Sequence, residues 1–347
     1  MTRTLAVFGK TGAKFMPMLA EQLPEWEVAG WVGADGDEAR DALIGRCEAA
    51  IISADFVLAA GNFGALLGGA KLELVIQPWA GTDWIDATQL PAHIKICNAT
   101  GHAAPMAEFV LGAMLEHVLE LRRIDADMRA GSWYRSGRNM ADDAPHGDLA
   151  GLRVGLIGYG QISEAVAVRA AAFDMEVEAI ARRARDAAPA PLARIGTRED
   201  LPRMLGDSDF VVVACDLNDD TRGMLDAAAF AAMKPTACLV NVARGEVIDE
   251  AALYDALSTR RIAAAAIDTW YRYPENIRDP EADPDRGGAF QGSRFDFAAL
   301  DNVLLTPHYA AHTHGADAAR YRCIARTLRA YTEGAPLERL VLTGTGG

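Results

Sequence analysis

The chain has 347 residues, of which 50% are hydrophobic and 24% are charged, a balance typical of a globular protein long enough for two packed domains. Its formal net charge of -14 argues against nucleic acids and anionic membranes as partners, because both attract clustered lysine and arginine. No apolar run approaches the roughly 20 residues of a membrane span, and five scattered cysteines without a Cys-x-x-Cys pair predict reduced thiols in a cytoplasmic protein.

The first hundred residues alternate short apolar runs with amphipathic segments, which predicts a small α/β unit. A long helix is predicted from Pro105 to about residue 130, and residues 131–149 are predicted to be irregular, either an arm at an interface or a plain surface loop. In this part of the chain we predict buried parallel strands at 5–8, 49–52, 72–76 and 94–96, and helices at 15–23, 37–46 and 63–70.

From Leu152 the alternation restarts, and its order predicts a doubly wound α/β fold. Residues 271–299, rich in Pro, Asp, Arg and Gly, are predicted to form a long loop, and such a loop in a compact domain is usually functional or mobile. The predicted strands are 152–157, 176–180, 210–214, 237–241, 263–267 and 303–305, with helices at 161–173 and about 312–332.

Residues 158–163 (Gly-Tyr-Gly-Gln-Ile-Ser) follow a predicted strand and begin a predicted helix. This is the context of a turn that lays its backbone against a dinucleotide pyrophosphate. The first glycine would allow the tight turn, and the second would let the phosphates approach the helix N-terminus, which favours anions. Ser163 replaces the usual third glycine and is small enough for helix–strand packing. The predicted cofactor ligands of this turn are Gly158, Gly160, Gln161 and Ile162.

An acid usually stands about 20 residues after such a turn and binds the ribose 2′-hydroxyl. Here strand 176–180 runs into Ala181-Arg182-Arg183-Ala184-Arg185, so guanidinium groups stand where the acid is expected. Because arginines pair with a 2′-phosphate, Arg182 and Arg183 favour NADP over NAD as the cofactor. The alternative is that the arginines form a solvated turn and Asp186 takes the ribose.

Two candidate catalytic residues follow later strands. Arg244, after strand 237–241, would grip a small carboxylate with its planar fork, and Gly245 would give the ligand access; a structural salt bridge is the alternative. His308, after strand 303–305, would carry a proton unless it is a structural histidine, and His102 is a weaker candidate of the same kind. Although His312 and His314 lie near His308, no acidic or cysteine cluster accompanies them, so no metal site is predicted.

Together these segments resemble the D-isomer-specific 2-hydroxyacid dehydrogenase family, which includes phosphoglycerate, glyoxylate/hydroxypyruvate and formate dehydrogenases. The resemblance covers nearly the whole chain and rests on residues 151–160, 241–245, 249–253, 266–268 and 302–308. It implies two doubly wound Rossmann-like domains: a substrate domain of residues 1–101 and 311–347, and an NAD(P)-binding domain of residues 102–310 inserted into it. It also implies a homodimer built largely through the nucleotide domains.

The resemblance further implies a role for each candidate residue. Arg244 would bind the substrate carboxylate and polarise its carbonyl, and His308 would donate a proton to the carbonyl oxygen while the nicotinamide delivers hydride. Asp268 would lie near the nicotinamide. On the substrate domain the implied ligands are the amides around Ala80, Gly81 and Thr82, which would help to hold the carboxylate, and His102, which would face the same cleft.

One position departs from the family pattern. The family places a glutamate five residues after the aspartate numbered 268 here, where it pairs with the catalytic histidine, but this chain has Tyr273. A carboxylate would raise the imidazole pKa by about 1–2 units, whereas a phenol supplies no charge at pH 7. His308 is therefore predicted to be a weaker proton reservoir, unless Glu275 reaches it. Formate dehydrogenases also use a neutral partner, a glutamine, which leaves formate as an alternative substrate.

The sequence thus predicts an oxidoreductase that prefers NADP and acts on a small 2-keto or 2-hydroxy acid, of the glyoxylate or hydroxypyruvate type. The alternative from another class is a nucleotide-binding redox sensor or regulator with little catalysis. Arg244 and His308 together favour the enzyme, whereas Tyr273 is the feature that keeps the regulator open as an alternative.

Overall fold

The computed structural model describes residues 2–13, 15–52, 69, 71–82, 85–133, 145–273 and 290–345. The chain divides into two compact units: unit 1 comprises Met1–His102 with Thr313–Gly347, and unit 2 comprises Ala103–His312. The predicted limits differ from these by one or two residues.

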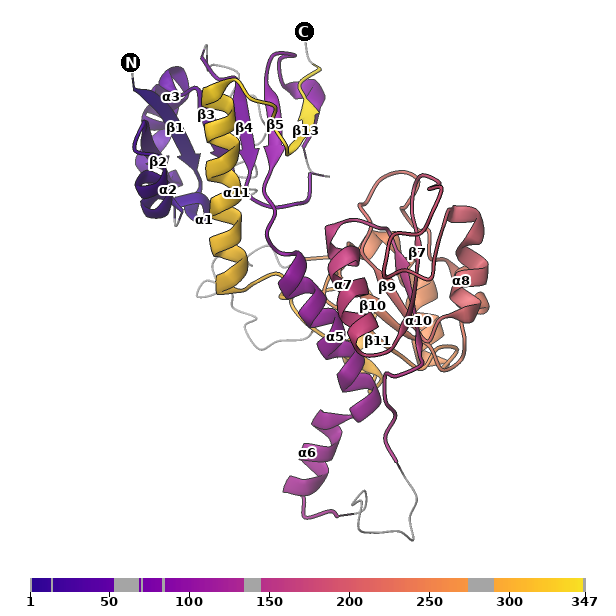
Figure 1. The fold of residues 1–347 in the computed structure, drawn as a ribbon. Helices are drawn as coiled ribbons and strands as arrows, with labels where there is room; N and C mark the ends of the chain where they lie inside the picture. The colour runs from indigo at the N-terminus through magenta and orange to yellow at the C-terminus, as the bar shows by residue number, and fades with distance from the viewer. Residues whose placement is uncertain are drawn as a thin grey trace. The chain divides into compact units, whose positions relative to one another are not determined.

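Unit 1 contains a six-stranded sheet in the order β13-β5-β4-β3-β1-β2 (Figure 1). All neighbouring strands are parallel except β13, which pairs antiparallel with β5. Without β13, the order of the first five strands is 2-1-3-4-5, one of the two common doubly wound arrangements. The elements of unit 1 are β1 (Arg3–Phe8), α1 (Lys10–Ala13), α2 (Met16–Gln22), β2 (Trp26–Trp31), η1 (Gly33–Asp35), α3 (Gly36–Arg46), β3 (Ala49–Ile52), β4 (Leu74–Gln77), η3 (Ala87–Gln89), β5 (Lys95–Asn98), α11 (His314–Glu333) and β13 (Leu340–Thr343).

The central strands of unit 1 are buried on both faces. Along β1, Leu5 and Val7 pack in one cluster with apolar residues of α2 and α11, while Ala6 and Phe8 pack in another with α3. Helix α11 runs along one face of the sheet (Figure 1). Because both faces are covered, these strands are continuous apolar runs, which made them recognisable in the sequence.

Unit 2 contains a seven-stranded parallel sheet in the order β12-β11-β10-β9-β6-β7-β8. If β6 is numbered as strand 1 and the sheet is read from β8, the order is 3-2-1-4-5-6-7, which is the dinucleotide-binding order 3-2-1-4-5-6 with one further strand. The strand order reverses between β6 and β9. The predicted fold class, two doubly wound α/β domains, is therefore confirmed. The elements of unit 2 are α5 (Ala103–Leu119), α6 (Leu121–Arg129), β6 (Arg153–Ile157), α7 (Gln161–Ala172), β7 (Glu176–Ile180), β8 (Arg194–Gly196), η4 (Arg198–Asp200), α8 (Leu201–Asp207), β9 (Phe210–Val213), α9 (Ala227–Ala232), β10 (Cys238–Asn241), η5 (Gly245–Val247), α10 (Glu250–Ser258), β11 (Ala264–Ile267), η6 (Phe297–Ala299) and β12 (Val303–Leu305).

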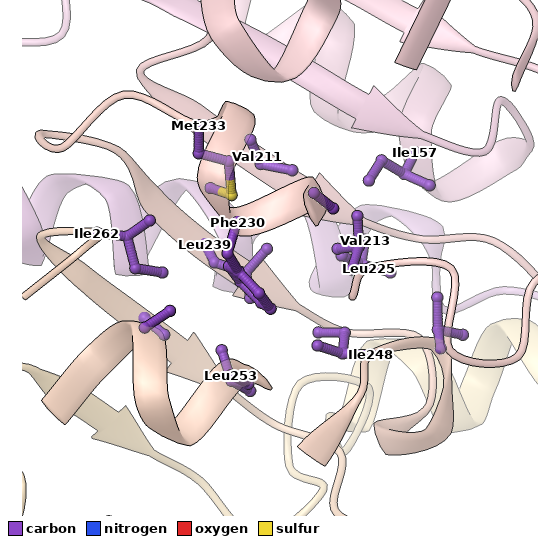
Figure 2. Packing of buried hydrophobic residues seen from close by; sticks show 14 of the residues in the cluster. Ile157, Val211, Val213, Leu225, Phe230, Met233, Leu239, Ile248, Leu253 and Ile262 are labelled. Atoms are coloured by element: carbon purple, nitrogen blue, oxygen red, sulfur yellow. The ribbon is translucent and has the colours of Figure 1, made fainter. Parts of the chain in front are cut away.

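Two apolar layers sandwich the sheet of unit 2. One contains α5 and α7, with residues such as Val110 and Val166 fully buried. The other contains α8, α9 and α10, and Figure 2 shows Phe230 of α9 and Leu253 of α10 gathered with strand residues such as Leu239. These layers fix the strand ends from which the candidate site residues project.

The single helix predicted over 105–130 is wrong. Glu120 adopts a left-handed conformation with φ 52°, which ends α5 and starts α6. Helix α5 buries one face, whereas α6 has no buried residue, so the apolar periodicity belongs to α5. Three strands, β2, β8 and β13, were not predicted. Most of the predicted helix at 63–70 and much of the loops at 131–149 and 271–299 lie outside the described residues.

Candidate active site

The turn between β6 and α7 has the shape that a dinucleotide site requires. Gly158 has a φ of 90°, and a Cβ there would stand 2.8 Å from the backbone of Cys215, so only glycine fits. Gly160 precedes α7, and no atom lies within 4 Å of the place its Cβ would take. The buried Ser163 hydroxyl donates to the Gly158 carbonyl at 2.7 Å. The first glycine and Ser163 thus shape the turn, and the second glycine leaves open space at the helix N-terminus, where Gln161 and Ile162 begin α7.

The basic segment after β7 lies beside this turn. Ala181 is buried, whereas Arg182 and Arg183 are exposed. The guanidinium carbon of Arg185 lies 5.1 Å from the ring centroid of Tyr159, which stands between the two glycines. The segment therefore brings positive charge to the glycine turn.

The turn that carries Arg244 is held by a buried asparagine at the end of β10. The Asn241 side chain accepts a hydrogen bond from the Ala243 amide at 3.0 Å and donates to the Arg244 carbonyl at 3.1 Å. Arg244 Nη1 donates to the Ala243 carbonyl at 2.8 Å. A Cβ on Gly245 would stand 2.6 Å from the backbone of Trp270. Gly245 was predicted to give a ligand access, but in the structure the missing side chain instead lets two chain segments touch.

Asp268, at the end of β11, anchors the segment that carries the histidine. Its side chain is 1% exposed, and its carboxylate accepts hydrogen bonds from the Thr306 hydroxyl at 2.6 Å and from the amides of Tyr309 and Ala310 at 2.7 and 3.0 Å. Its carbonyl accepts the His308 amide at 2.8 Å. The Asp268 carboxylate is thus committed to positioning residues 306–310.

His308 and Tyr273 form a hydrogen-bonded pair. The Tyr273 hydroxyl lies 3.0 Å from His308 Nδ1 and accepts the Trp270 amide at 3.2 Å. His308 has a φ of 57°, a left-handed conformation that costs energy for a residue with a Cβ and that clusters at functional sites. The Tyr273 hydroxyl can donate to Nδ1 of a neutral imidazole or accept the Nδ1–H of an imidazolium, so it engages Nδ1 in both protonation states of His308.

Although 41% of Tyr273 is exposed, partial desolvation of its hydroxyl raises the pKa above the ordinary value of 10.0, while the Trp270 hydrogen bond and the positive charge of Arg244 act in the opposite direction. Tyr273 is therefore a neutral phenol at pH 7. Gly245, which follows Arg244, packs against the backbone of Trp270, whose amide donates to Tyr273, so Arg244 and Tyr273 lie on neighbouring segments. Glu275 lies outside the described residues.

The remaining candidates belong to unit 1. The carbonyls of Ala80 and Gly81 accept hydrogen bonds from the side chains of Asn98 and Gln77, at 2.7 and 3.2 Å. Across the described parts of the chain, no acceptor is found for the amides of residues 80–82. His102 is partly exposed at the end of this unit. The loop after β4 is therefore held by its carbonyls and keeps its donors available.

Three supporting residues had not been recognised in the sequence as parts of the site: Asn241, Trp270 and Thr306. Besides its bond to Tyr273, Trp270 donates from Nε1 to the Thr306 carbonyl at 2.8 Å. Each lies within three residues of a predicted site residue, at or shortly after the end of a strand, which is the signal that would have found them.

Other side-chain chemistry is sparse where the structure describes the chain. No group of three His, Cys, Asp or Glu residues is arranged to hold a metal ion there. All five cysteines are free thiols, and burial raises the pKa of Cys215 to about 12. The helices of the described ranges include none that is long and apolar enough to cross a bilayer.

Comparison with known proteins agrees with this geometry. Residues 111–310 match the family described as D-isomer specific 2-hydroxyacid dehydrogenase, NAD binding domain. A glyoxylate reductase of Pyrococcus furiosus is 32% identical over 270 residues, 76% of this chain and 74% of the relative. A hydroxypyruvate reductase of Thermotoga maritima is 30% identical over 247 residues, 71% of this chain and 72% of the relative.

Solved structures show the same fold. A D-isomer specific 2-hydroxyacid dehydrogenase of Xanthobacter autotrophicus, in complex with NADPH and MES, superposes with a TM-score of 0.76 at 26% identity, covering 99% of this chain and 98% of that one. Since the matched nucleotide domain spans more than half of the chain and the relatives cover most of it, the chain belongs to the D-isomer-specific 2-hydroxyacid dehydrogenase family of oxidoreductases.

Proposed function

We propose that this chain is an NADPH-dependent reductase of small 2-keto acids, of the kind represented by glyoxylate and hydroxypyruvate. The observation that carries the proposal is the Tyr273–His308 hydrogen bond on a segment that packs against Gly245, next to Arg244, in a unit whose glycine turn leaves open space at a helix N-terminus. The names of the two relatives, a glyoxylate reductase and a hydroxypyruvate reductase, agree with it.

Each residue has a distinct task in this reaction. Arg244 binds the substrate carboxylate and polarises the carbonyl, because its planar fork matches two carboxylate oxygens. His308 donates a proton from Nε2 to the carbonyl oxygen, while Tyr273 holds Nδ1. A bound nicotinamide supplies the hydride. Asp268 keeps the histidine segment in place and lies close to the nicotinamide.

The loop after β4 supplies further donors for the carboxylate. The amides of Ala80, Gly81 and Thr82 form a short run of N–H groups whose carbonyls are tied elsewhere. Such runs of amides bind anions well, because they need no reorganisation when charge arrives. His102 contacts the same substrate.

The cofactor preference rests on Arg182 and Arg183, which are exposed beside the glycine turn with no acid before them. Pairing with the 2′-phosphate contributes on the order of 1–3 kcal/mol, so NADPH should bind about 5- to 150-fold more tightly than NADH. Fluorescence titration of both cofactors tests this. Equal or reversed dissociation constants would show that the arginines form a solvated turn and that Asp186 takes the ribose.

A substrate panel tests the reaction itself. NADPH oxidation is followed with glyoxylate, hydroxypyruvate and pyruvate, and NADP reduction with formate. We expect turnover of the keto acids and none of formate. Tight cofactor binding without turnover of any keto acid would identify a regulator, and turnover of formate alone would identify a formate-type enzyme.

The chain is also proposed to form a homodimer through unit 2. Helix α6 extends beyond the sheet of unit 2 (Figure 1) and carries Leu121 and Met128, which are 56% and 43% exposed, on one face. An exposed apolar stripe of this kind marks an interaction surface. Light scattering should give the mass of a dimer, and Leu121→Glu should weaken it. A monomeric wild-type chain would overturn the assignment; the cytoplasmic location stays a prediction.

A further inference from the structure

One asparagine connects the loop after β4 to the C-terminal segment of the chain. Asn98, the last residue of β5, is 6% exposed. Its Oδ1 accepts hydrogen bonds from Nε and Nη2 of Arg339 at 3.1 and 2.8 Å, and its Nδ2 donates to the Ala80 carbonyl at 2.7 Å. Because a guanidinium only donates, Oδ1 must face Arg339 and Nδ2 must face Ala80. A defined series of hydrogen bonds therefore runs from a cation to the loop, entirely within unit 1.

Arg339 directs its charge to this neutral side chain and not to an acid. Within the ranges that the structure describes, it forms no ion pair. The segment does not need the guanidinium to reach the sheet, because β13 pairs with β5 and the Arg339 carbonyl accepts the Asn98 amide at 3.2 Å. A hydrogen bond from a charged donor is roughly twice as strong as a neutral one. The guanidinium therefore acts mainly on the orientation of the Asn98 side chain.

That orientation affects the donors of the loop. The Ala80 carbonyl and the Gly81 amide belong to one peptide unit, so a hydrogen bond to the carbonyl polarises the N–H and strengthens it as a donor. Gln77 holds the next carbonyl, that of Gly81, at 3.2 Å, but its own Oε1 is buried and has no partner among the described residues. Of the two side chains that hold the loop, only Asn98 is thus anchored on a cation. Ala80 is exposed and Gly81 is partly exposed, so an anion can reach these amides from solvent.

We propose that Arg339 is a positioning residue: through Asn98 it orients and polarises the Ala80–Gly81 peptide, so that the Gly81 amide binds the carboxylate of the substrate. This inference rests on the proposed function, which gives the amides of this loop a share in holding the carboxylate. Arg339 itself does not touch the substrate. A donor fixed in advance needs no rearrangement when charge arrives. Loss of Arg339 should therefore weaken binding of the keto acid and leave the chemical step and the cofactor unaffected.

Steady-state kinetics with glyoxylate separate positioning from a merely structural role. Arg339→Met should raise KM about 2- to 12-fold, the effect of one hydrogen bond. Because the carboxylate is bound alike in the ground state and the transition state, kcat should change little, and so should the dissociation constant of NADPH. Arg339→Lys keeps a charged donor and should recover part of the loss. Arg322→Met is the matched control, since it removes an exposed cation of the same unit and should leave KM unchanged.

Asn98→Asp is the second variant. An aspartate still pairs with Arg339, so the C-terminal segment stays attached, but it presents an acceptor to the Ala80 carbonyl where a donor is needed. We expect KM to rise at least as much as in Arg339→Met, and thermal unfolding of both variants verifies that they fold. An unchanged KM in Asn98→Asp, or a loss in kcat without a rise in KM in Arg339→Met, would show that Arg339 only attaches the segment and would overturn the inference.

A measurement without turnover separates this inference from the proposed function. Hydrogen exchange of the amides of residues 80–82 is followed by mass spectrometry in the NADPH-saturated enzyme, with and without oxamate, an unreactive analogue of a keto acid. Slower exchange with oxamate in the wild type and in Arg322→Met, and a smaller effect in Arg339→Met, supports the inference even if no keto acid is reduced. Equal protection in Arg339→Met and the wild type, or no protection in the wild type, overturns it, while keto-acid turnover would still support the reductase. If Arg339→Met does not fold, Arg339→Lys and Asn98→Asp decide.

Discussion

Replacing Tyr273 by glutamate should move the pH profile of keto-acid reduction, because it gives His308 a charged partner. In the structure the partner is a neutral hydroxyl, 3.0 Å from Nδ1, whose raised pKa keeps it protonated beyond pH 10.0. The acid that reduces the keto group is the protonated imidazole, so kcat/KM should fall as the pH rises through the pKa of the histidine. Tyr273 does not titrate below that range, so the falling limb belongs to His308.

The size of the effect follows from the charge alone. A carboxylate beside an imidazolium raises its pKa by about 1–2 units, so Tyr273→Glu should move the falling limb about 1–2 pH units upward. Tyr273→Gln is the matched control, since it has the shape of glutamate without the charge and should leave the limb in place. Tyr273→Phe removes one orienting hydrogen bond, which is worth about 0.5–1.5 kcal/mol, so kcat/KM should fall only about 2- to 12-fold. His308→Ala, which removes the donor, should cost more.

The assay is NADPH oxidation with saturating cofactor and limiting glyoxylate, from about pH 5.5 to 9. Identical limbs in Tyr273→Glu and Tyr273→Gln would show that the residue at this position does not tune the proton donor. If His308→Ala keeps most of the activity, another group, such as His102 or His312, is the proton donor, and the assignment of His308 is wrong.

Three further predictions follow from the same contacts. Arg244→Lys keeps the charge and loses the planar fork, so kcat/KM should fall about 10- to 150-fold while the dissociation constant of NADPH changes little; near wild-type kcat/KM would show that the anion is held elsewhere. Asp268→Asn replaces an acceptor oxygen of a buried carboxylate by a donor, so urea unfolding should show a loss of about 1–3 kcal/mol, and unchanged stability would contradict the anchoring role. His117 packs edge-on against Phe210, and burial lowers its pKa below 6.5. The unfolded chain then binds the proton more readily, so stability should decrease as the pH falls below about 6.5. His117→Phe should lessen that decrease between pH 7 and 5, and an equal decrease in both proteins would rule out His117 as its source.

The signals that predicted the site are local in the chain. The glycine turn could be placed because Gly158 and Gly160 lie between an apolar strand and a helix, and the Ser163–Gly158 hydrogen bond that shapes it spans only five positions. The substitution of Tyr273 for an acid could be read from its spacing to Asp268. The committed carboxylate of Asp268 could not be predicted, because its partners lie 38 to 42 residues away. Gly245 was misread for the same reason, since its neighbour in space is Trp270.

The sequence by itself determined the two doubly wound units, because strands buried on both faces are apolar without interruption and can be counted along the chain. It missed β2, β8 and β13, which are edge strands of the two sheets. An edge strand has one neighbour and keeps exposed positions, so it lacks that continuous pattern; all of β13 is partly or fully exposed. Only the tertiary structure decided which donors and acceptors meet, such as Tyr273 with His308 or Tyr309 with Asp268. Those pairings depend on how distant strand ends converge, and no short stretch of sequence records that.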